Sequence, residues 1–170
     1  KTASYKVSAV DRNGYESFTS EPRLVYAPNA ATTVEIEKFA PKSDRKYINF
    51  GGNGFVELTK ENNTNITVTV NVKEAGTYLM NFRYSNGSGP RSTDNRCAIR
   101  SLYLNNAYKG VIVMPQRGQN EWSDWGNSND FTVKLKKGEN KIRIQFDDWN
   151  NNMNVDDNTA MLDSMKMIKL

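Results

Sequence analysis

The chain contains 170 residues, of which 37% are hydrophobic and 25% are charged, as in one medium-sized domain or a domain with a fragment attached. It has no histidine and a single cysteine, Cys97, which excludes His-based catalytic triads, His-ligated zinc, internal disulfides and multi-cysteine metal cages. The net charge is +4, and its basic residues are scattered among acids, so a nucleic-acid partner is not expected. No apolar run approaches the roughly 18 residues of a membrane-spanning helix.

Residues 1–27 are expected to form a separate unit, followed by a linker at residues 28–32. The run Ser4–Asp11 alternates between apolar and polar residues, turns at Arg12–Gly14 and continues towards Pro22. With Tyr5 in the place of a corner tyrosine, this pattern resembles the last two strands of a fibronectin type III domain. Two strands are too few to build a core. We therefore expect the C-terminal tail of such a domain, and a longer multidomain parent protein.

Residues 33–170 are predicted to form an all-β domain. Apolar residues alternate with polar ones in four runs, which are bounded by turn-forming residues: Ile66–Val72, Tyr78–Tyr84, Phe131–Leu135 and Ile142–Phe146. Period-2 alternation indicates strands with one buried face, and no segment keeps a helical period over ten positions. The fold class predicted is all-β, an antiparallel β-sandwich. Cys97 lies in a further strand-like run, Arg96–Leu104, and is expected to be a small buried residue.

Three carboxylates are candidates for a metal site. Glu35 and Glu37 lie two positions apart in the first predicted strand of this domain, so both side chains would point to the same side. Like charges at that spacing are costly unless water or a cation separates them, and Asp163 in the last strand has the oxygen chemistry to complete a Ca²⁺ site. The alternative is a pair of exposed acids on an edge strand.

A second group of candidates lies in or beside predicted loops, where binding residues often occur. Trp122 and Trp125 are three positions apart, so one is expected in the core and one exposed. Trp149 lies in a polar loop with no obvious core partner. Exposed rings stack on the apolar faces of sugars, while planar polar side chains bind the hydroxyl groups. The polar candidates are Asn86, Arg91, Asp94, Arg96, Asn152 and Asn154.

Several short motifs occur in a distinctive order along residues 33–170: Glu35-Ile36-Glu37, Ala75-Gly76-Thr77-Tyr78, Arg83-Tyr84-Ser85-Asn86-Gly87, Trp122-Ser123-Asp124-Trp125 and Met161-Leu162-Asp163. Their order resembles carbohydrate-binding modules of families 6 and 35. The resemblance implies a jelly-roll β-sandwich with a structural calcium ion held by the positions of Glu35, Glu37 and Asp163. It also places Trp125 in the core and Trp122 at the surface.

The function expected from this resemblance is non-catalytic binding of a polysaccharide or oligosaccharide. The module would be attached to the catalytic domain of a larger bacterial glycoside hydrolase or lyase that is secreted, periplasmic or on the cell surface. Catalysis by this fragment is not expected, because it lacks histidine and any facing pair of carboxylates. Arg91 and Arg96 would suit acidic sugars.

One position departs from the family pattern, because Met161 stands where many members have a sugar-binding asparagine. The alternative function is therefore a structural spacer that packs against the catalytic domain without binding sugar.

Overall fold

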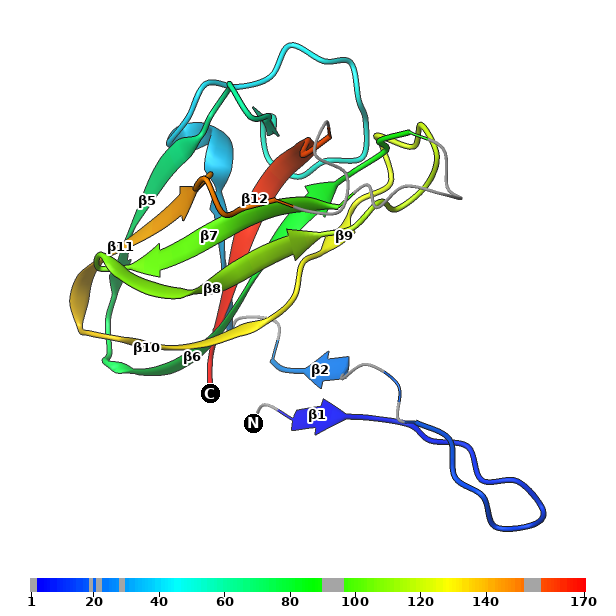
Figure 1. The fold of residues 1–170 in the computed structure, drawn as a ribbon. Helices are drawn as coiled ribbons and strands as arrows, with labels where there is room; N and C mark the ends of the chain where they lie inside the picture. The colour runs from blue at the N-terminus through cyan, green and yellow to red at the C-terminus, as the bar shows by residue number, and fades with distance from the viewer. Residues whose placement is uncertain (1–2, 19, 21–22, 28–29, 90–96, 152–156) are drawn as a thin grey trace.

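The computed structural model describes residues 3–18, 20, 23–27, 30–89, 97–151 and 157–170 (Figure 1). Within these residues the structure is almost entirely β, with one short 3₁₀ turn. In chain order the elements are β1 (Ala3–Tyr5), β2 (Arg23–Val25), β3 (Ala31–Glu35), η1 (Ile36–Lys38), β4 (Val56–Leu58), β5 (Asn65–Val72), β6 (Gly76–Ser85), β7 (Ala98–Leu104), β8 (Ala107–Met114), β9 (Gly126–Asn127), β10 (Phe131–Leu135), β11 (Gly138–Gln145) and β12 (Ala160–Lys169). A search of the described residues finds no helix with the length and apolar character needed to cross a membrane.

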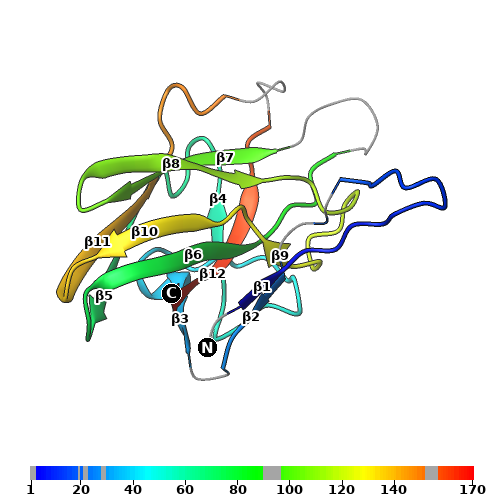
Figure 2. The ribbon, with the colours of Figure 1, turned by 90° about the horizontal axis from the view of Figure 1, so that it is seen from below.

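Two antiparallel sheets face each other and enclose the core (Figures 1 and 2). The six-stranded sheet has the order β10-β6-β12-β3, with β4 also paired to β12 and β9 to β6. The four-stranded sheet has the order β5-β11-β7-β8. These strand orders, stated for the described residues, confirm the predicted antiparallel β-sandwich.

The alternating sequence explains why the two sheets pack together. In the pairing of β5 with β11, Ile66 lies opposite Ile144 and Val68 lies opposite Ile142, and each of the four is at most 1% exposed. The polar residues between them point away from the other sheet. Each strand therefore contributes one apolar face to a shared core, where burial supplies the main stabilising free energy.

Strand β12 departs from simple alternation, because it is buried along most of its length. It lies between β6 and β3 in the six-stranded sheet. The long loop at residues 39–55 also reaches it, since the backbone N–H of Gly51 donates to Asp163. In Figure 1 this loop, drawn in cyan, arches over one end of the sandwich. The loop therefore contacts β12 at Asp163, which is fully buried.

Strands β1 and β2 and the described residues between them form a hairpin that extends away from the sandwich (Figure 1). Strand β1 pairs with β2, Val10 bridges to Glu16, and the turn passes through Gly14 at a φ of 86°. Apolar side chains on this hairpin are exposed, with Phe18 fully so. The assignment to a fibronectin type III domain and the proposed boundaries stay predictions.

Candidate functional site

The three candidate carboxylates come together beside the centre of β12. Glu35 ends β3 and pairs in register with Ser164, the residue after Asp163. Our expectation that Glu35 and Glu37 share one strand is wrong, because the strand ends at Glu35 and Glu37 lies in η1. The pairing of β12 with β6 shifts register between Leu162 and Ser164, which places Asp163 at a β-bulge. Bulges redirect a side chain that strict alternation would send elsewhere.

Asp163 is fully buried, and its carboxylate contacts Arg83, the backbone of Gly51 and the hydroxyl of Ser164. One carboxylate oxygen, Oδ2, lies 2.5 Å from Nη1 of Arg83, and Oδ1 accepts the Gly51 N–H at 3.0 Å. The other guanidinium nitrogen of Arg83 donates to the carbonyl of Asn49 at 2.8 Å. Arg83 therefore neutralises Asp163 and also ties strand β6 to the loop at residues 39–55.

Glu35 and Glu37 are less well satisfied than Asp163. The Oε2 atom of each is buried and has no hydrogen-bond partner among the described residues, whereas Oε1 of Glu37 accepts the Asn53 N–H at 3.3 Å. Burial raises the pKa of Glu35, and the negative charges of Asp163 and Glu37 raise it further. Buried acceptors without donors cost free energy. These two oxygens are therefore suited to a cation.

A glycine keeps the backbone close to these carboxylates. Gly52 has a φ of +56°, and a Cβ placed on it would lie 2.8 Å from Oε2 of Glu35. Only glycine tolerates both the backbone conformation and the close approach without strain. The turn at residues 51–53 therefore brings backbone atoms next to the carboxylates.

The donor set fits a hard cation such as Ca²⁺, which prefers carboxylate and carbonyl oxygens. As positioned, however, the described residues contain no group of three or more His, Cys, Asp or Glu side chains able to hold a metal ion. Asp163 is instead paired with Arg83. The calcium site therefore stays a prediction.

Next to the carboxylates, the loop at residues 39–55 carries a cluster of aromatic rings. The ring of Tyr47 lies between those of Phe55 and Trp122, at centroid distances of 5.9 and 5.8 Å and interplanar angles of 22° and 12°. Trp125 contacts Phe55 and Phe50 at steeper angles. Aromatic packing of this kind holds the loop in one conformation.

The two tryptophans differ less in exposure than we expected from the sequence, since both are half-buried. Trp125 donates its indole N–H to the carbonyl of Ile48 at 2.7 Å, and the Arg83 guanidinium lies 5.5 Å from its ring. Trp122 stacks on Tyr47. The role of Trp122 as a binding platform stays a prediction.

Two neighbouring hollows lie along the same loop and share Lys42, Ser43 and Asp44. One, of about 400 Å³, extends past Tyr47 to Phe55. The other, of about 570 Å³, reaches Glu57 and the turn at residues 61–63. Together they form a groove along the end of the sandwich, which we call the loop-end groove.

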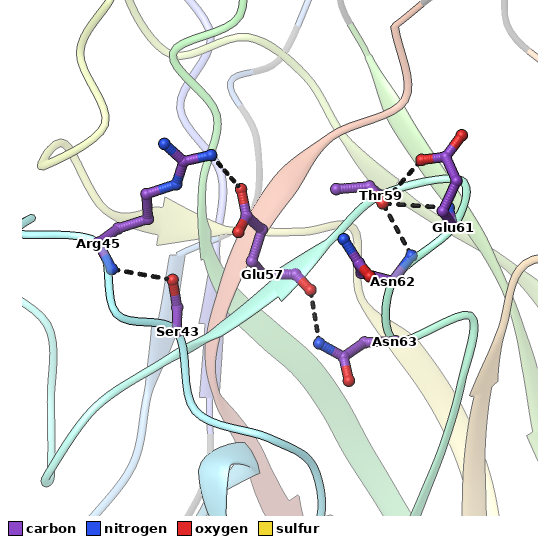
Figure 3. Close-up of polar contacts among 7 residues, drawn as sticks. All are labelled: Ser43, Arg45, Glu57, Thr59, Glu61, Asn62 and Asn63. Atoms are coloured by element: carbon purple, nitrogen blue, oxygen red, sulfur yellow. Dashed lines mark hydrogen bonds and ion pairs between the residues drawn. The ribbon is translucent and has the colours of Figure 1, made fainter.

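Polar contacts organise the wall of the loop-end groove (Figure 3). Arg45 and Glu57 form an ion pair at 3.1 Å, and the side-chain amide of Asn63 donates to the Glu57 carbonyl at 2.8 Å. The hydroxyl of Thr59 accepts the backbone N–H groups of Glu61 and Asn62 at 3.0 and 2.8 Å. Planar charged groups and amides therefore surround a hollow that also has aromatic rings nearby.

Sequence reasoning missed Arg45, Glu57 and Tyr47. The one available signal was the short Val56-Glu57-Leu58 alternation, which predicts that Glu57 points away from the core. Glu57 lies opposite Met161 in the register of β4 with β12. Met161 is only 1% exposed. Its thioether also lacks the amide that an asparagine would offer to the groove.

The remaining predicted residues are distributed as follows. Asn86 is 1% exposed, and its side chain donates to the Met114 carbonyl and accepts the Ser88 N–H, so it holds a loop together. Trp149 is 63% exposed. The other polar candidates lie outside the described residues: Arg91, Asp94, Arg96, Asn152 and Asn154.

A buried arginine joins the loops at this end of the sandwich. Arg100 is fully buried, and its guanidinium donates to carbonyls of Ile99, Thr59 and Asn158 and to the Asn158 side chain. It also lies 4.9 Å from the ring of Phe146. Burial lowers the pKa of Arg100 to about 10. Arg100 therefore ties the turn after β4 to the segment that precedes β12.

The fold corresponds to that of a known class of domain. No protein-family model matches the chain. The structure resembles a family 35 carbohydrate-binding module from Cellvibrio japonicus Abf62, with a TM-score of 0.59 and 17% identity over 81% of this chain and 92% of that one. A family 35 module from Clostridium thermocellum also aligns, with a TM-score of 0.59 and 20% identity over 82% of this chain and 98% of that one. The chain therefore has the jelly-roll β-sandwich fold of family 35 modules.

Relatives by sequence are longer enzymes. The chain is 32% identical to an isomaltosyltransferase of Sporosarcina globispora over 124 residues, 70% of this chain and 10% of that protein. It is 29% identical to a cycloisomaltooligosaccharide glucanotransferase of Niallia circulans over 74% of this chain and 12% of that protein. The chain thus spans about a tenth of the length of the curated relatives it matches. A Paenibacillus cycloisomaltooligosaccharide glucanotransferase, solved with cycloisomaltoheptaose, aligns with a TM-score of 0.62 and 24% identity over 82% of this chain and 18% of that one.

Proposed function

We propose that this chain is a non-catalytic carbohydrate-binding module of a larger carbohydrate-active enzyme, and that it binds α-1,6-linked glucose oligomers. The observation that carries the proposal is the loop-end groove, which is lined by Tyr47 and Arg45; Trp122 stacks on Tyr47, and Glu57 pairs with Arg45. The ligand class is proposed because the sequence relatives include an isomaltosyltransferase and a 1,6-α-glucosyltransferase.

The groove supplies both kinds of contact that a sugar needs. Because Phe55 and Trp122 cover the Tyr47 ring, the apolar surface for the C–H face of a glucose ring comes from the half-buried Trp122. Arg45 and Glu57 offer planar donors and acceptors for hydroxyl groups, and their mutual ion pair holds each in place. The side chain of Arg45 is 55% exposed, so it can contact a ligand without unfolding the loop.

In the parent enzyme, such a module would act by tethering. Binding one part of a glucan chain raises the effective concentration of the remainder near a linked catalytic domain. We propose that the parent protein is secreted or lies on the cell surface, where it would encounter polymeric glucan. The candidates Arg91, Asp94, Arg96, Asn152 and Asn154 remain part of the proposed ligand-binding set.

We also propose that Ca²⁺ binds between Glu35, Glu37 and Asp163 and has a structural role. The two buried, unpartnered Oε2 atoms support this proposal, because a cation would supply the positive charge they lack. A thermal melt with EDTA and then with excess calcium tests it. At a concentration 100 times its dissociation constant, calcium should stabilise the fold by about 2.7 kcal/mol. An unchanged melting temperature would remove the calcium proposal without affecting the sugar proposal.

The sugar proposal is tested by titrating the full chain with isomaltooligosaccharides in a calorimeter. We expect binding, and we expect Trp122→Ala to weaken it by about tenfold or more, a loss of about 1.4 kcal/mol. Tyr15→Ala is the matched control, since Tyr15 is an exposed ring on the hairpin, 76% accessible. No heat of binding with any α- or β-glucan would contradict the proposal.

A second candidate function, a structural spacer, is favoured by one observation. Met161 is buried at the position where related modules are expected to carry a sugar-binding asparagine. A spacer would bind its own catalytic domain and no sugar. Wild-type binding of the oligosaccharide that is lost in Trp122→Ala would exclude it.

A further inference from the structure

Arg83 links the six-stranded sheet to the loop at residues 39–55 through a single guanidinium group. In the sheet register Arg83 lies opposite Ser164 of β12 on one side and Asn127 of β9 on the other, so strands on both sides fix its backbone. Both hollows of the loop-end groove are lined by other residues, and Arg83 is not among them. An effect of Arg83 on a ligand in the groove would therefore act through the loop.

The Arg83 guanidinium contacts two oxygen atoms and an aromatic ring at the same time. Nη1 lies 2.5 Å from Oδ2 of Asp163, Nη2 donates to the Asn49 carbonyl at 2.8 Å, and the group lies 5.5 Å from the ring centre of Trp125. Asp163 is fully buried, so it gives the guanidinium a fixed anchor. The planar fork of arginine can make both polar contacts together, whereas lysine offers one charged nitrogen on a flexible stem.

Asn49, which accepts from Arg83, lies where the loop backbone has an uncommon conformation. Its φ is 65°, in the left-handed region that a free chain rarely populates, so contacts with the surroundings must hold it there. On one side of Asn49, the Ile48 carbonyl accepts the Trp125 indole N–H at 2.7 Å. On the other side, the Gly51 N–H donates to the buried carboxylate of β12 at 3.0 Å. The contact to Asn49 is therefore the middle one of three that hold this stretch.

The groove residues come directly before this stretch in the chain. Tyr47 and Arg45 both line the smaller hollow, and Tyr47 is the neighbour of Ile48. The Tyr47 ring also supports that of Trp122, at a centroid distance of 5.8 Å and an interplanar angle of 12°. The Arg45 side chain is 55% exposed, and its one ion pair is to Glu57 at 3.1 Å. The positions of these side chains thus depend on how firmly the backbone that follows them is held.

We propose that Arg83 is a positioning residue for sugar binding, which fixes the loop so that Arg45 and Tyr47 keep their places in the groove. Arg83 does this without contacting the sugar. The inference rests on the proposed function, because it concerns the same groove and the same ligand class, α-1,6-linked glucose oligomers. A loop already held in its binding conformation loses little entropy when the ligand binds, so releasing the loop lowers the affinity.

The experiment compares the wild-type chain with two arginine-to-lysine variants of the full chain, all in the same calcium-containing buffer. Arg83→Lys keeps a positive charge beside Asp163 but cannot also hold the Asn49 carbonyl. Arg12→Lys is the matched control, because Arg12 is an exposed residue of the hairpin. Calorimetry with isomaltooligosaccharides measures the affinity, and thermal unfolding measures the stability.

We expect Arg83→Lys to bind isomaltooligosaccharides about tenfold more weakly than the wild type, while its melting temperature falls by about 4 °C or less. A residue that only stabilises the fold would give the reverse pattern, a lower melting temperature with an unchanged affinity of the folded chain. Arg12→Lys should match the wild type in both measurements.

Amide hydrogen exchange tests the same inference without any sugar. We expect peptides that cover residues 48–53 to exchange about tenfold faster in Arg83→Lys, because the released loop opens locally more often. Peptides from β5 should keep their wild-type rates, since that strand belongs to the other sheet. Faster exchange in β5 as well would indicate a global loss of stability and would overturn the inference.

The outcomes separate this inference from the proposed function. Sugar binding that Arg83→Lys retains in full would overturn the inference and leave the loop-end groove in place. Unchanged exchange across residues 48–53 would also overturn it, whatever the sugar affinity. No sugar binding by the wild type would refute the proposed function, and with it the role of Arg83 in binding, even where the exchange data show that Arg83 holds the loop.

Discussion

Replacing Asp163 by alanine in the presence of EDTA should strongly destabilise the chain. The carboxylate is fully buried, pairs with Arg83 and accepts the Gly51 N–H. Removing one partner of a buried ion pair costs about 3–5 kcal/mol. Because the Arg83 side chain is 35% exposed and water reaches it, we expect the lower end of that range, about 3 kcal/mol. For a chain of this length, that corresponds to a fall in melting temperature of about 6–12 °C.

The assay is thermal or urea unfolding of Asp163→Ala, Arg83→Met and the double variant, all in EDTA, so that the ion pair is measured without any cation. If the two side chains stabilise each other, the double variant should lose less than the sum of the single losses, by about 0.5–3 kcal/mol. Asp148→Ala, at an exposed carboxylate, should change stability by at most about 0.5 kcal/mol. Additive losses would refute the coupling inferred from the structure. With calcium added, Arg83→Met should keep a stabilising response that Asp163→Ala lacks.

Three further predictions concern the same end of the sandwich. In EDTA, Glu35→Gln should be more stable than the wild type at pH 7. This difference in the free energy of unfolding should disappear as the pH falls towards 4.5. The raised pKa of Glu35 means that its charged form destabilises the folded chain, and protonation removes that charge. Unfolding at a series of pH values measures the difference, and a difference independent of pH would contradict the prediction. Gly52→Ala should lower the free energy of unfolding by about 1–2 kcal/mol, because the residue has a positive φ, and it should weaken calcium binding. A calcium titration measures the affinity, and an unchanged affinity would argue against the site. Arg100→Met should lower stability by about 3 kcal/mol in urea unfolding, because the buried carbonyls of Thr59 and Asn158 lose the donor that Arg100 supplies. A loss below about 1 kcal/mol would show that Arg100 is dispensable.

Prediction from the sequence worked best where a local pattern reports burial directly. The alternation at Ile66–Val72 and Tyr78–Tyr84 predicted β5 and β6, because a strand with one face in the core must place apolar residues at every second position. Cys97 is buried, as expected. The order of the motifs then indicated a jelly-roll β-sandwich, which the similarity to family 35 modules confirms.

The site was less predictable, because its contacts join residues far apart in the chain. Asp163 and Arg83 are 80 positions apart, and their ion pair depends on a bulge between Leu162 and Ser164 that no alternation pattern signals. In the same way, Tyr47 meets Trp122 only because the loop at residues 39–55 folds across the end of the sandwich.

The sequence by itself therefore determined the strands, the sandwich and the residue types available for binding. The tertiary structure decided which of those residues meet: Arg45 with Glu57, and Tyr103 with Arg143. The physical reason is that strand periodicity is a local property, set by which face of the chain is buried. Side-chain contacts instead depend on sheet register and loop path, which form only when the whole chain packs.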